Sequence, residues 1–153
     1  MNIVHSSKLK NAIRFATQVH EIDQKQKRKG KDIPYITHPL AVGPLLSQVG
    51  ASTDVVVAGI LHDTLEDAHP DYPVTPEMIE QQFGKEVLDL VESVTEPDKG
   101  VSYDERKQEA LAHVKTMTHD QILLKSADVL SNMEELIADY REHGDLVFER
   151  FNT

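Results

Sequence analysis

Four side chains that can bind a metal or move protons lie within one short stretch, at His62, Asp63, Glu66 and Asp67. They follow an apolar run at 55–61, which predicts that a buried helix carries them. On a helix, side chains four residues apart share a face, so the four groups would form one polar edge. Burying an imidazole and three carboxylates without compensation costs on the order of several kcal/mol per charge. The stretch therefore predicts a cation site, with Glu66 and Asp67 placed to orient water or shuttle protons.

Two further residues complete the ligand set that the sequence predicts. His38 lies near the start of the preceding predicted helix, and Asp128 interrupts the otherwise apolar run 123–130. Together with His62 and Asp63 they offer two imidazoles and two carboxylates. The chain has no cysteine, and this donor set suits Mn²⁺, Fe²⁺, Co²⁺ or Mg²⁺ better than a closed zinc site. One divalent ion, Mn²⁺ foremost, is expected, and it would activate a water and polarise a phosphoryl oxygen.

A basic stretch at 25–31 stands out in a chain whose formal net charge is −10, and it lies just upstream of His38. Arg28 within it could supply a fork of donors to phosphate or stack on a base, although a solvated surface loop is an equal alternative. Asn132 follows Asp128 by one helical turn and would share its face. It is therefore a candidate for the site or for helix packing.

Composition limits the class of protein. A chain of 153 residues with 39% hydrophobic content predicts a single domain, 1–153, although its abrupt end in an apolar segment leaves open a longer native chain. The negative net charge argues against broad attraction to nucleic acid or to an anionic membrane. No run approaches the roughly 18 apolar residues of a membrane span, and the start of the chain lacks a signal-peptide pattern. We expect a cytoplasmic protein.

The apolar periodicity predicts an all-α, compact bundle of about six or seven helices. The expected helices cover about residues 6–21, 37–49, 54–67, 75–83, 87–94, 102–117 and 120–140, with an apolar segment at 145–153.

The same periodicity predicts which side chains face the core. The inner stripe expected for 102–117 consists of Ala110, Leu111 and Val114. The inner stripe expected for 120–140 consists of Ile122, Leu123, Ala127, Leu130, Met133, Leu136 and Ile137. His20 lies on the inner face of the first helix, where a structural role is expected more often than one beside a ligand. The acidic residues that the second stripe leaves outside, Glu134, Glu135, Asp139 and Glu142, are expected to form a solvated face.

Several short motifs occur in a characteristic order along the chain. These are the segment 35–39 (YITHP), the segment 61–67 (LHDTLED), Phe83-Gly84, and the segment 125–128 (KSAD) followed by Asn132. The sequence resembles HD-superfamily metal-dependent phosphohydrolases, in particular the alarmone (ppGpp) hydrolase domain of the RelA/SpoT branch in its small stand-alone type. The resemblance covers most of the chain and implies an HD-domain helical bundle.

The resemblance also implies roles for individual residues. The metal ligands of the family correspond to His38, His62, Asp63 and Asp128. The catalytic acidic pair of the family corresponds to Glu66 and Asp67. Its guanosine-contacting basic loop corresponds to Arg28 and Lys29, and an asparagine near the substrate corresponds to Asn132.

The sequence thus predicts a metal-dependent phosphohydrolase that acts on a nucleotide, and removal of the 3′-pyrophosphate of ppGpp is the specific expectation. Alarmone hydrolases usually carry a basic residue where this chain has Val129, and an aromatic residue or histidine where it has Ser131. A nucleotide phosphohydrolase of other specificity therefore stays an alternative. A non-catalytic nucleotide or metal sensor is a third possibility, against which the presence of both Glu66 and Asp67 argues.

Overall fold

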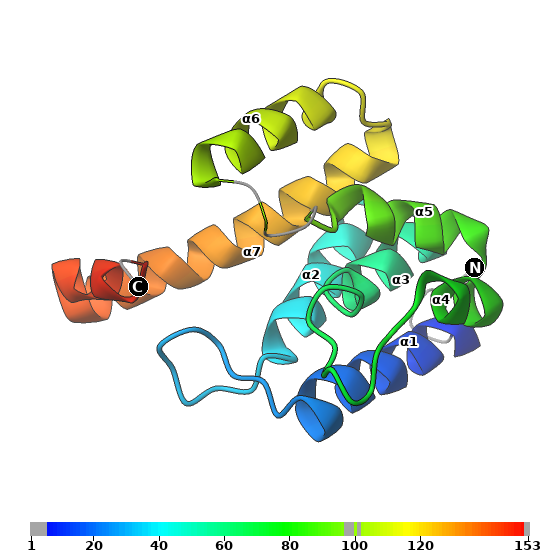
Figure 1. The fold of residues 1–153 in the computed structure, drawn as a ribbon, viewed down its shortest axis with the longest axis horizontal. Coiled ribbons are helices and arrows are strands. Elements are labelled where there is room, and N and C mark those ends of the chain that lie inside the picture. Colours follow the sequence, from blue (N-terminus) through cyan, green and yellow to red (C-terminus); the bar gives the residue numbers. More distant parts are fainter. Residues whose placement is uncertain (1–5, 97–99, 101, 152–153) are drawn as a thin grey trace.

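Seven α-helices follow one another along residues 6–96, 100 and 102–151, the part of the chain that this computed structural model describes (Figure 1). They are α1 (Ser7–Thr17), α2 (Thr37–Gln48), α3 (Thr53–Leu61), α4 (Pro76–Phe83), α5 (Lys85–Val94), α6 (Tyr103–Val114) and α7 (His119–His143). A π-helical segment, η2 (Gln18–Asp23), extends α1, and a 3₁₀ segment, η3 (Gly144–Phe151), follows α7. The all-α prediction is confirmed.

Most helices begin at a side chain that accepts a hydrogen bond from the first turn, which satisfies a backbone N–H that has no partner within the helix. Ser52 accepts from the backbone of Val55 at the start of α3. Ser102 and Thr118 form reciprocal capping boxes at the starts of α6 and α7. These caps explain why the predicted helix starts fall close to those observed.

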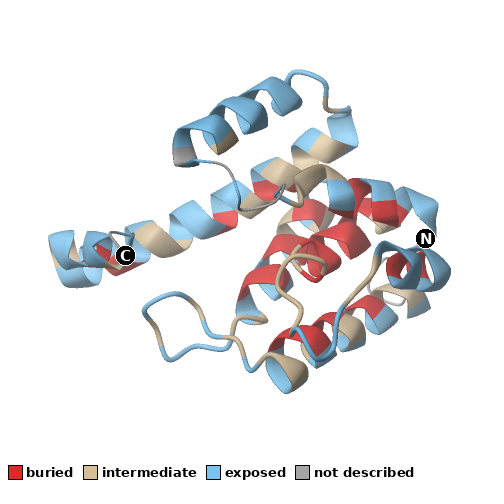
Figure 2. Ribbon diagram, viewed as in Figure 1, coloured by how far each residue is buried: buried red, intermediate tan, exposed pale blue. Residues whose placement is uncertain are grey.

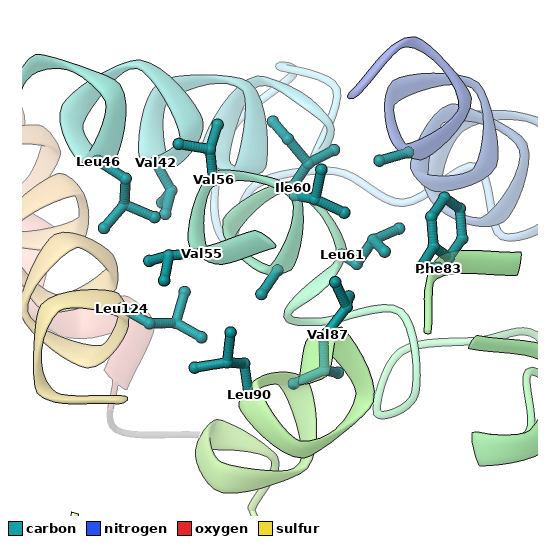
Figure 3. Close-up of a cluster of buried hydrophobic side chains, with 14 of the residues drawn as sticks. Val42, Leu46, Val55, Val56, Ile60, Leu61, Phe83, Val87, Leu90 and Leu124 are labelled. Carbon is teal, nitrogen blue, oxygen red and sulfur yellow. The ribbon is translucent and has the colours of Figure 1, made fainter. Parts of the chain in front are cut away.

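Helix α3 is the centre of the molecule, and all seven residues of 55–61 are buried (Figure 2). It packs against α1, α2, α5 and α7. Figure 3 shows the side chains of Val55 and Leu61 among Leu46 of α2, Val87 of α5 and Leu124 of α7. The functional stretch at 62–67 therefore begins at the end of the most buried helix, which holds it rigidly in place.

Two glycines let α2 and α3 approach closely. A Cβ added at Gly59 would lie 2.6 Å from Cδ1 of Leu46, and one added at Gly43 would lie 2.6 Å from Cδ1 of Ile60. Real Cβ atoms do not make contacts this short, so a larger residue at either position would force the neighbouring leucine or isoleucine side chain to move.

The inner stripes predicted for the last two long helices are wrong in part. Ala110, Leu111 and Val114 of α6 are all exposed. In α7, Leu124 and Ala127 are buried and Leu123 packs on the core, whereas the side chains at 122, 130, 133 and 137 are exposed. The reason is geometric, because the 25 residues of α7 extend about 37 Å and only its first half meets α2, α3 and α5 (Figure 2). Within the described residues, no helix is long and apolar enough to cross a bilayer.

Candidate active site

Helix α3 ends at Leu61, earlier than the predicted span 54–67. The carbonyl of Leu61 accepts hydrogen bonds from both the backbone N–H and the hydroxyl of Thr64, at 2.9 and 2.8 Å. Nδ1 of His62 lies 2.8 Å from the carbonyl oxygen of Gly59. Because these short-range bonds replace the helical ones, the residues that follow form turns. The predicted helix 54–67 is therefore too long, and residues 62–67 lie after its end, where the backbone N–H of Asp67 still donates to the carbonyl of Asp63.

Helices α2 and α3 are joined by a short connection and pack antiparallel, so the first turn of α2 lies beside the end of α3. This arrangement brings together His38 and His62, whose ring centroids are 5.1 Å apart. Helix α7 contributes Asp128, whose Oδ1 lies 3.1 Å from Nε2 of His38 and 3.5 Å from Nε2 of His62. One ligand atom from each of these three residues lies within 4.8 Å of the others, close enough to share one metal ion.

Asp63 stands beside this cluster. Its Oδ2 lies 2.9 Å from Nε2 of His62 and 3.9 Å from Nε2 of His38. The structure thus places all four residues of the predicted ligand set together, although they come from three elements of the fold.

The chemistry of the cluster fits a cation. Nε2 of His62 is buried and makes no hydrogen bond with any described residue, despite the nearby carboxylates. Burial alone would lower the pKa of His62, but Asp63 and Asp128 outweigh it and raise that pKa to about 10. The two buried carboxylates therefore favour the protonated, positively charged form of His62. A divalent ion can supply the same positive charge in place of that proton.

Residues on α7 fix the orientation of two members of the cluster. The hydroxyl of Ser131 lies 3.2 Å from Nδ1 of His38, which leaves Nε2 of that ring facing the cluster. Lys125 and Asn132 donate hydrogen bonds to Asp128, at 3.2 and 3.0 Å. Sequence reasoning did not assign Ser131 to the site, although its spacing of three residues from Asp128 places both on one face of the helix.

Tyr35 is a second residue that sequence reasoning missed. Its hydroxyl donates a hydrogen bond to Oδ2 of Asp63, and its ring lies next to the rings of His20 and His38. The guanidinium carbon of Arg28 lies over the Tyr35 ring, 5.3 Å from its centroid. Burial and the neighbouring Asp63 raise the pKa of the Tyr35 phenol above its usual range, so the hydroxyl stays protonated and acts as the hydrogen-bond donor. The position of Tyr35 in the YITHP segment, three residues before His38, was the sequence feature that could have indicated its role.

The predicted acidic pair lies in the turns after α3, and both side chains are half-buried. Asp67 accepts a hydrogen bond at Oδ2 from the side-chain amide of Gln26, at 3.0 Å. Glu66 accepts one from the backbone of Glu96, at 3.4 Å. Burial raises the pKa of Glu66 above its ordinary value, which brings that carboxyl closer to the range useful for proton transfer.

A cavity of about 630 Å³ opens beside the cluster. Its walls carry cations from three parts of the chain, namely the basic loop with Arg28 and Lys29, α6 with Lys107, and η3 with Arg150. Asn132 also lines it. The structure therefore brings together the three predicted substrate-binding residues, Arg28, Lys29 and Asn132. Six cations and the two carboxylates of Glu96 and Glu135 lie in the described lining, so the cavity carries an excess of positive charge suited to a polyanion.

Hydrogen bonds connect the cavity to the cluster. Arg28 donates from Nη2 to Oδ1 of Asn132 at 2.8 Å, and Asn132 donates from Nδ2 to Oδ1 of Asp128 at 3.0 Å. The Arg28 guanidinium and the Asp128 carboxylate are thus separated by a single amide.

Two acidic residues of α7 hold the basic loop and η3 in place. Glu135 accepts hydrogen bonds from Arg28 and Lys31. Asp139 pairs with Lys31 at 2.6 Å and with Arg150 at 2.8 Å. Asp139 is only 8% exposed, so the predicted solvated face is wrong for these two residues. The prediction failed because the cationic partners of these residues lie on the basic loop and η3, and the periodicity of α7 contains no information about them.

Comparisons with known proteins agree with this geometry. A family model described as "HD domain" matches residues 12–151. The chain is 38% identical over 127 residues to guanosine-3′,5′-bis(diphosphate) 3′-pyrophosphohydrolase MESH1 of Xenopus tropicalis, a match covering 82% of this chain and 67% of that protein. It is 36% identical over 135 residues to guanosine-3′,5′-bis(diphosphate) 3′-pyrophosphohydrolase of Aquifex aeolicus, covering 86% of this chain but only 18% of that longer protein.

The fold has a close counterpart among solved structures. A structure described as a metazoan ortholog of SpoT that hydrolyses ppGpp superposes with a TM-score of 0.73 and 28% sequence identity. The superposition covers 87% of this chain and 72% of that one. These two relatives and this solved structure carry the same stated activity, hydrolysis of ppGpp.

Proposed function

The chain belongs to the HD domain family, and from that premise we propose that it is a metal-dependent 3′-pyrophosphohydrolase acting on the guanosine alarmone ppGpp. The observation that carries the proposal is the short link from Arg28 through Asn132 to Asp128. A polyphosphate bound by the cations of the cavity would present a phosphorus atom next to the cluster of imidazoles and carboxylates. The stated activity of the relatives agrees with this arrangement.

The proposed ligands are His38, His62, Asp63 and Asp128, and the proposed ion is Mn²⁺, with Fe²⁺, Co²⁺ or Mg²⁺ as alternatives for the same donors. When bound there, a divalent ion lowers the pKa of a water molecule and polarises a phosphoryl oxygen.

The chain's own residues supply the rest of the reaction. Arg28 and Lys29 hold the phosphates, and the Arg28 guanidinium can make two parallel hydrogen bonds to one phosphate. Glu66 and Asp67 orient the attacking water and manage its proton. A P–O bond forms from water, the bond to the 3′ oxygen breaks, and that oxygen leaves with a proton. The products are pyrophosphate and the guanosine 5′-diphosphate.

A nucleotide phosphohydrolase of other specificity is the second candidate, because Val129 and Ser131 differ from the usual alarmone hydrolase residues. Neither residue is among the described residues that line the cation cavity. Ser131 contacts His38, and Val129 lines a separate surface hollow on α7. These two differences therefore lie outside the place where substrate phosphates would bind, which favours the alarmone. A nucleotide partner rather than nucleic acid, one domain and a cytoplasmic location remain predictions.

One assay tests the proposal. The purified protein is incubated with Mn²⁺ and a panel of nucleotides that includes ppGpp, beside a His62→Ala, Asp63→Ala double variant. We expect pyrophosphate release from ppGpp by the wild type alone. Release from a different nucleotide would overturn the alarmone assignment, and no metal-dependent product from any nucleotide would overturn the enzyme assignment.

A further inference from the structure

We propose that Gln26 is a positioning residue that holds the carboxylate of Asp67 in one orientation and is itself held by a hydrogen bond to the buried His20. The inference rests on the function proposed above and adds to its catalytic site a residue outside the acidic pair and the metal ligands. Gln26 donates from Nε2 to Oδ2 of Asp67 at 3.0 Å, and its Oε1 lies 2.8 Å from Nδ1 of His20.

Asp67 needs such a partner because it lies beyond the end of α3. Its backbone N–H donates to the carbonyl of Asp63 at 2.9 Å, but this bond leaves the side chain free to rotate. The amide of Gln26 engages Oδ2 and leaves Oδ1 as the oxygen that can contact a water molecule. Catalytic carboxylates act efficiently only when their orientation is fixed in advance.

Gln26 is itself held at two points by one residue. Its backbone N–H donates to the carbonyl of His20 at 2.8 Å, in addition to the side-chain bond. His20 is fully buried and lies in the π-helical segment η2, a wide helical turn that is rare and often found at functional sites. Lys25, just before Gln26, has a φ of 49°, in the left-handed region that non-glycine residues seldom adopt. The backbone just before Gln26 therefore has an unusual conformation, which places the side-chain amide of Gln26 between His20 and Asp67.

The direction of the link follows from the chemistry of its ends. An ionised carboxylate only accepts hydrogen bonds, so Nε2 of Gln26 faces Asp67 and Oε1 faces His20. His20 must then carry a proton on Nδ1. Burial lowers the pKa of His20, and the nearby His62 lowers it further. Gln26, Asp63 and Asp67 act in the opposite direction but do not outweigh burial. The neutral Nδ1–H tautomer is therefore the form that the structure requires.

Two substitutions separate the two halves of the link. Gln26→Glu at about pH 8 is ionised, so it accepts from His20 but cannot donate to Asp67. Gln26→Met makes neither bond. Both variants should lower kcat for the substrate of the wild type by about tenfold or more, since Asp67 acts after binding. Gln26 also lines the cavity, so the effect on kcat should exceed any effect on KM. Gln81→Met makes the same change at an exposed position of α4 and should leave kcat and KM unaltered.

The second measurement needs no activity. Nitrogen-15 NMR of the histidine rings in the metal-free protein should show the Nδ1–H tautomer for His20 in the wild type and in Gln26→Glu, and its loss in Gln26→Met. An Nε2–H tautomer in the wild type, or wild-type kcat in Gln26→Glu, would overturn the inference while leaving the proposed function intact. Absence of hydrolysis by the wild type would instead overturn the proposed function.

Discussion

The hydroxyl of Tyr35 donates a hydrogen bond to Asp63, and so the loop that precedes α2 contacts a proposed metal ligand directly. The bond is made by Oδ2, the oxygen of Asp63 that also faces His62, so it fixes the orientation of the carboxylate toward the cluster and helps to keep it ionised.

We therefore expect Tyr35→Phe to weaken Mn²⁺ binding by about 10-fold or more, because partners of metal ligands commonly contribute this much. The substituted ring should still stack against the guanidinium of Arg28. Calorimetric titration with Mn²⁺ measures the affinity. Tyr72→Phe, which removes the hydroxyl of an exposed tyrosine, is the matched control and should bind as the wild type does. Equal affinity in both variants would contradict the role assigned to Tyr35.

Metal binding should stabilise the fold. An ion that binds only the folded state at 100 times its Kd adds about 2.7 kcal/mol to the free energy of unfolding. Thermal unfolding should therefore shift upward with Mn²⁺ for the wild type and return to its starting value after chelation. His62→Ala should show no shift, whereas His119→Ala, at an exposed position at the start of α7, should retain it. An equal shift in His62→Ala would place the ion elsewhere.

Arg28→Lys tests the phosphate contact. A lysine keeps the charge but loses the planar fork of donors, and it also loses the stacking on Tyr35. We expect KM for the substrate to rise by about tenfold, which corresponds to about 1.4 kcal/mol, with a smaller change in kcat. Steady-state kinetics on ppGpp provide the measurement. Arg14→Lys, an exposed position on α1, should leave both constants unchanged.

The contact of Glu135 with the basic loop predicts a pH-dependent stability. Burial alone would raise the pKa of Glu135, but hydrogen bonds from Arg28 and Lys31 outweigh it and hold that pKa below its ordinary value. The ionised form thus stabilises the folded protein above the unfolded pKa of about 4.3, and this contribution is lost as the pH falls through the folded pKa.

Glu135→Gln should consequently lower the free energy of unfolding by roughly 0.5–1 kcal/mol near neutral pH, a range typical of partly exposed ion pairs. The difference from the wild type should shrink as the pH falls below the unfolded pKa of about 4.3 and vanish once the pH is below the lowered folded pKa of Glu135. Urea unfolding at several pH values measures it. A difference that does not change with pH would show that the glutamine acts through packing.

Gly59→Ala tests the close approach of α2 and α3. The added Cβ would lie 2.6 Å from Cδ1 of Leu46 and 3.2 Å from Cγ1 of Val42, in the interior of the bundle. We expect a net destabilisation of about 1–2 kcal/mol, since overpacking outweighs the gain in helix propensity. Gly100→Ala, where no atom lies within 4 Å of the added Cβ, is the control for the urea experiment.

Local chemistry determined what the sequence could predict. The predicted starts of α3 and α7 fall close to those observed, where Ser52 and Thr118 form caps, and the buried character of α3 followed from its continuous apolar run. His38 and Asp128 could be grouped with His62 because polar residues in apolar surroundings need a partner. Their residue types and places in the sequence carried enough information for that step.

Contacts between segments that are far apart in the sequence could not be predicted from local patterns. The periodicity of α7 identifies an apolar face but not the point at which the core ends, so Leu130 and Ile137 were placed wrongly in the interior. The early end of α3 depends on the bonds of one threonine, Thr64. The partners of Asp139 come from the basic loop and η3, which no local pattern on α7 indicates.

Asp139 forms ion pairs with both Lys31 and Arg150, which are synthesised at very different times. During synthesis the basic loop leaves the ribosome early, whereas η3 leaves more than a hundred residues later. A nascent chain that lacks η3 already contains the helices of the core, but its cavity lacks one wall and the cation that lies there. The cavity wall formed by η3 is therefore completed late in synthesis, after the residues of the hydrophobic core are available.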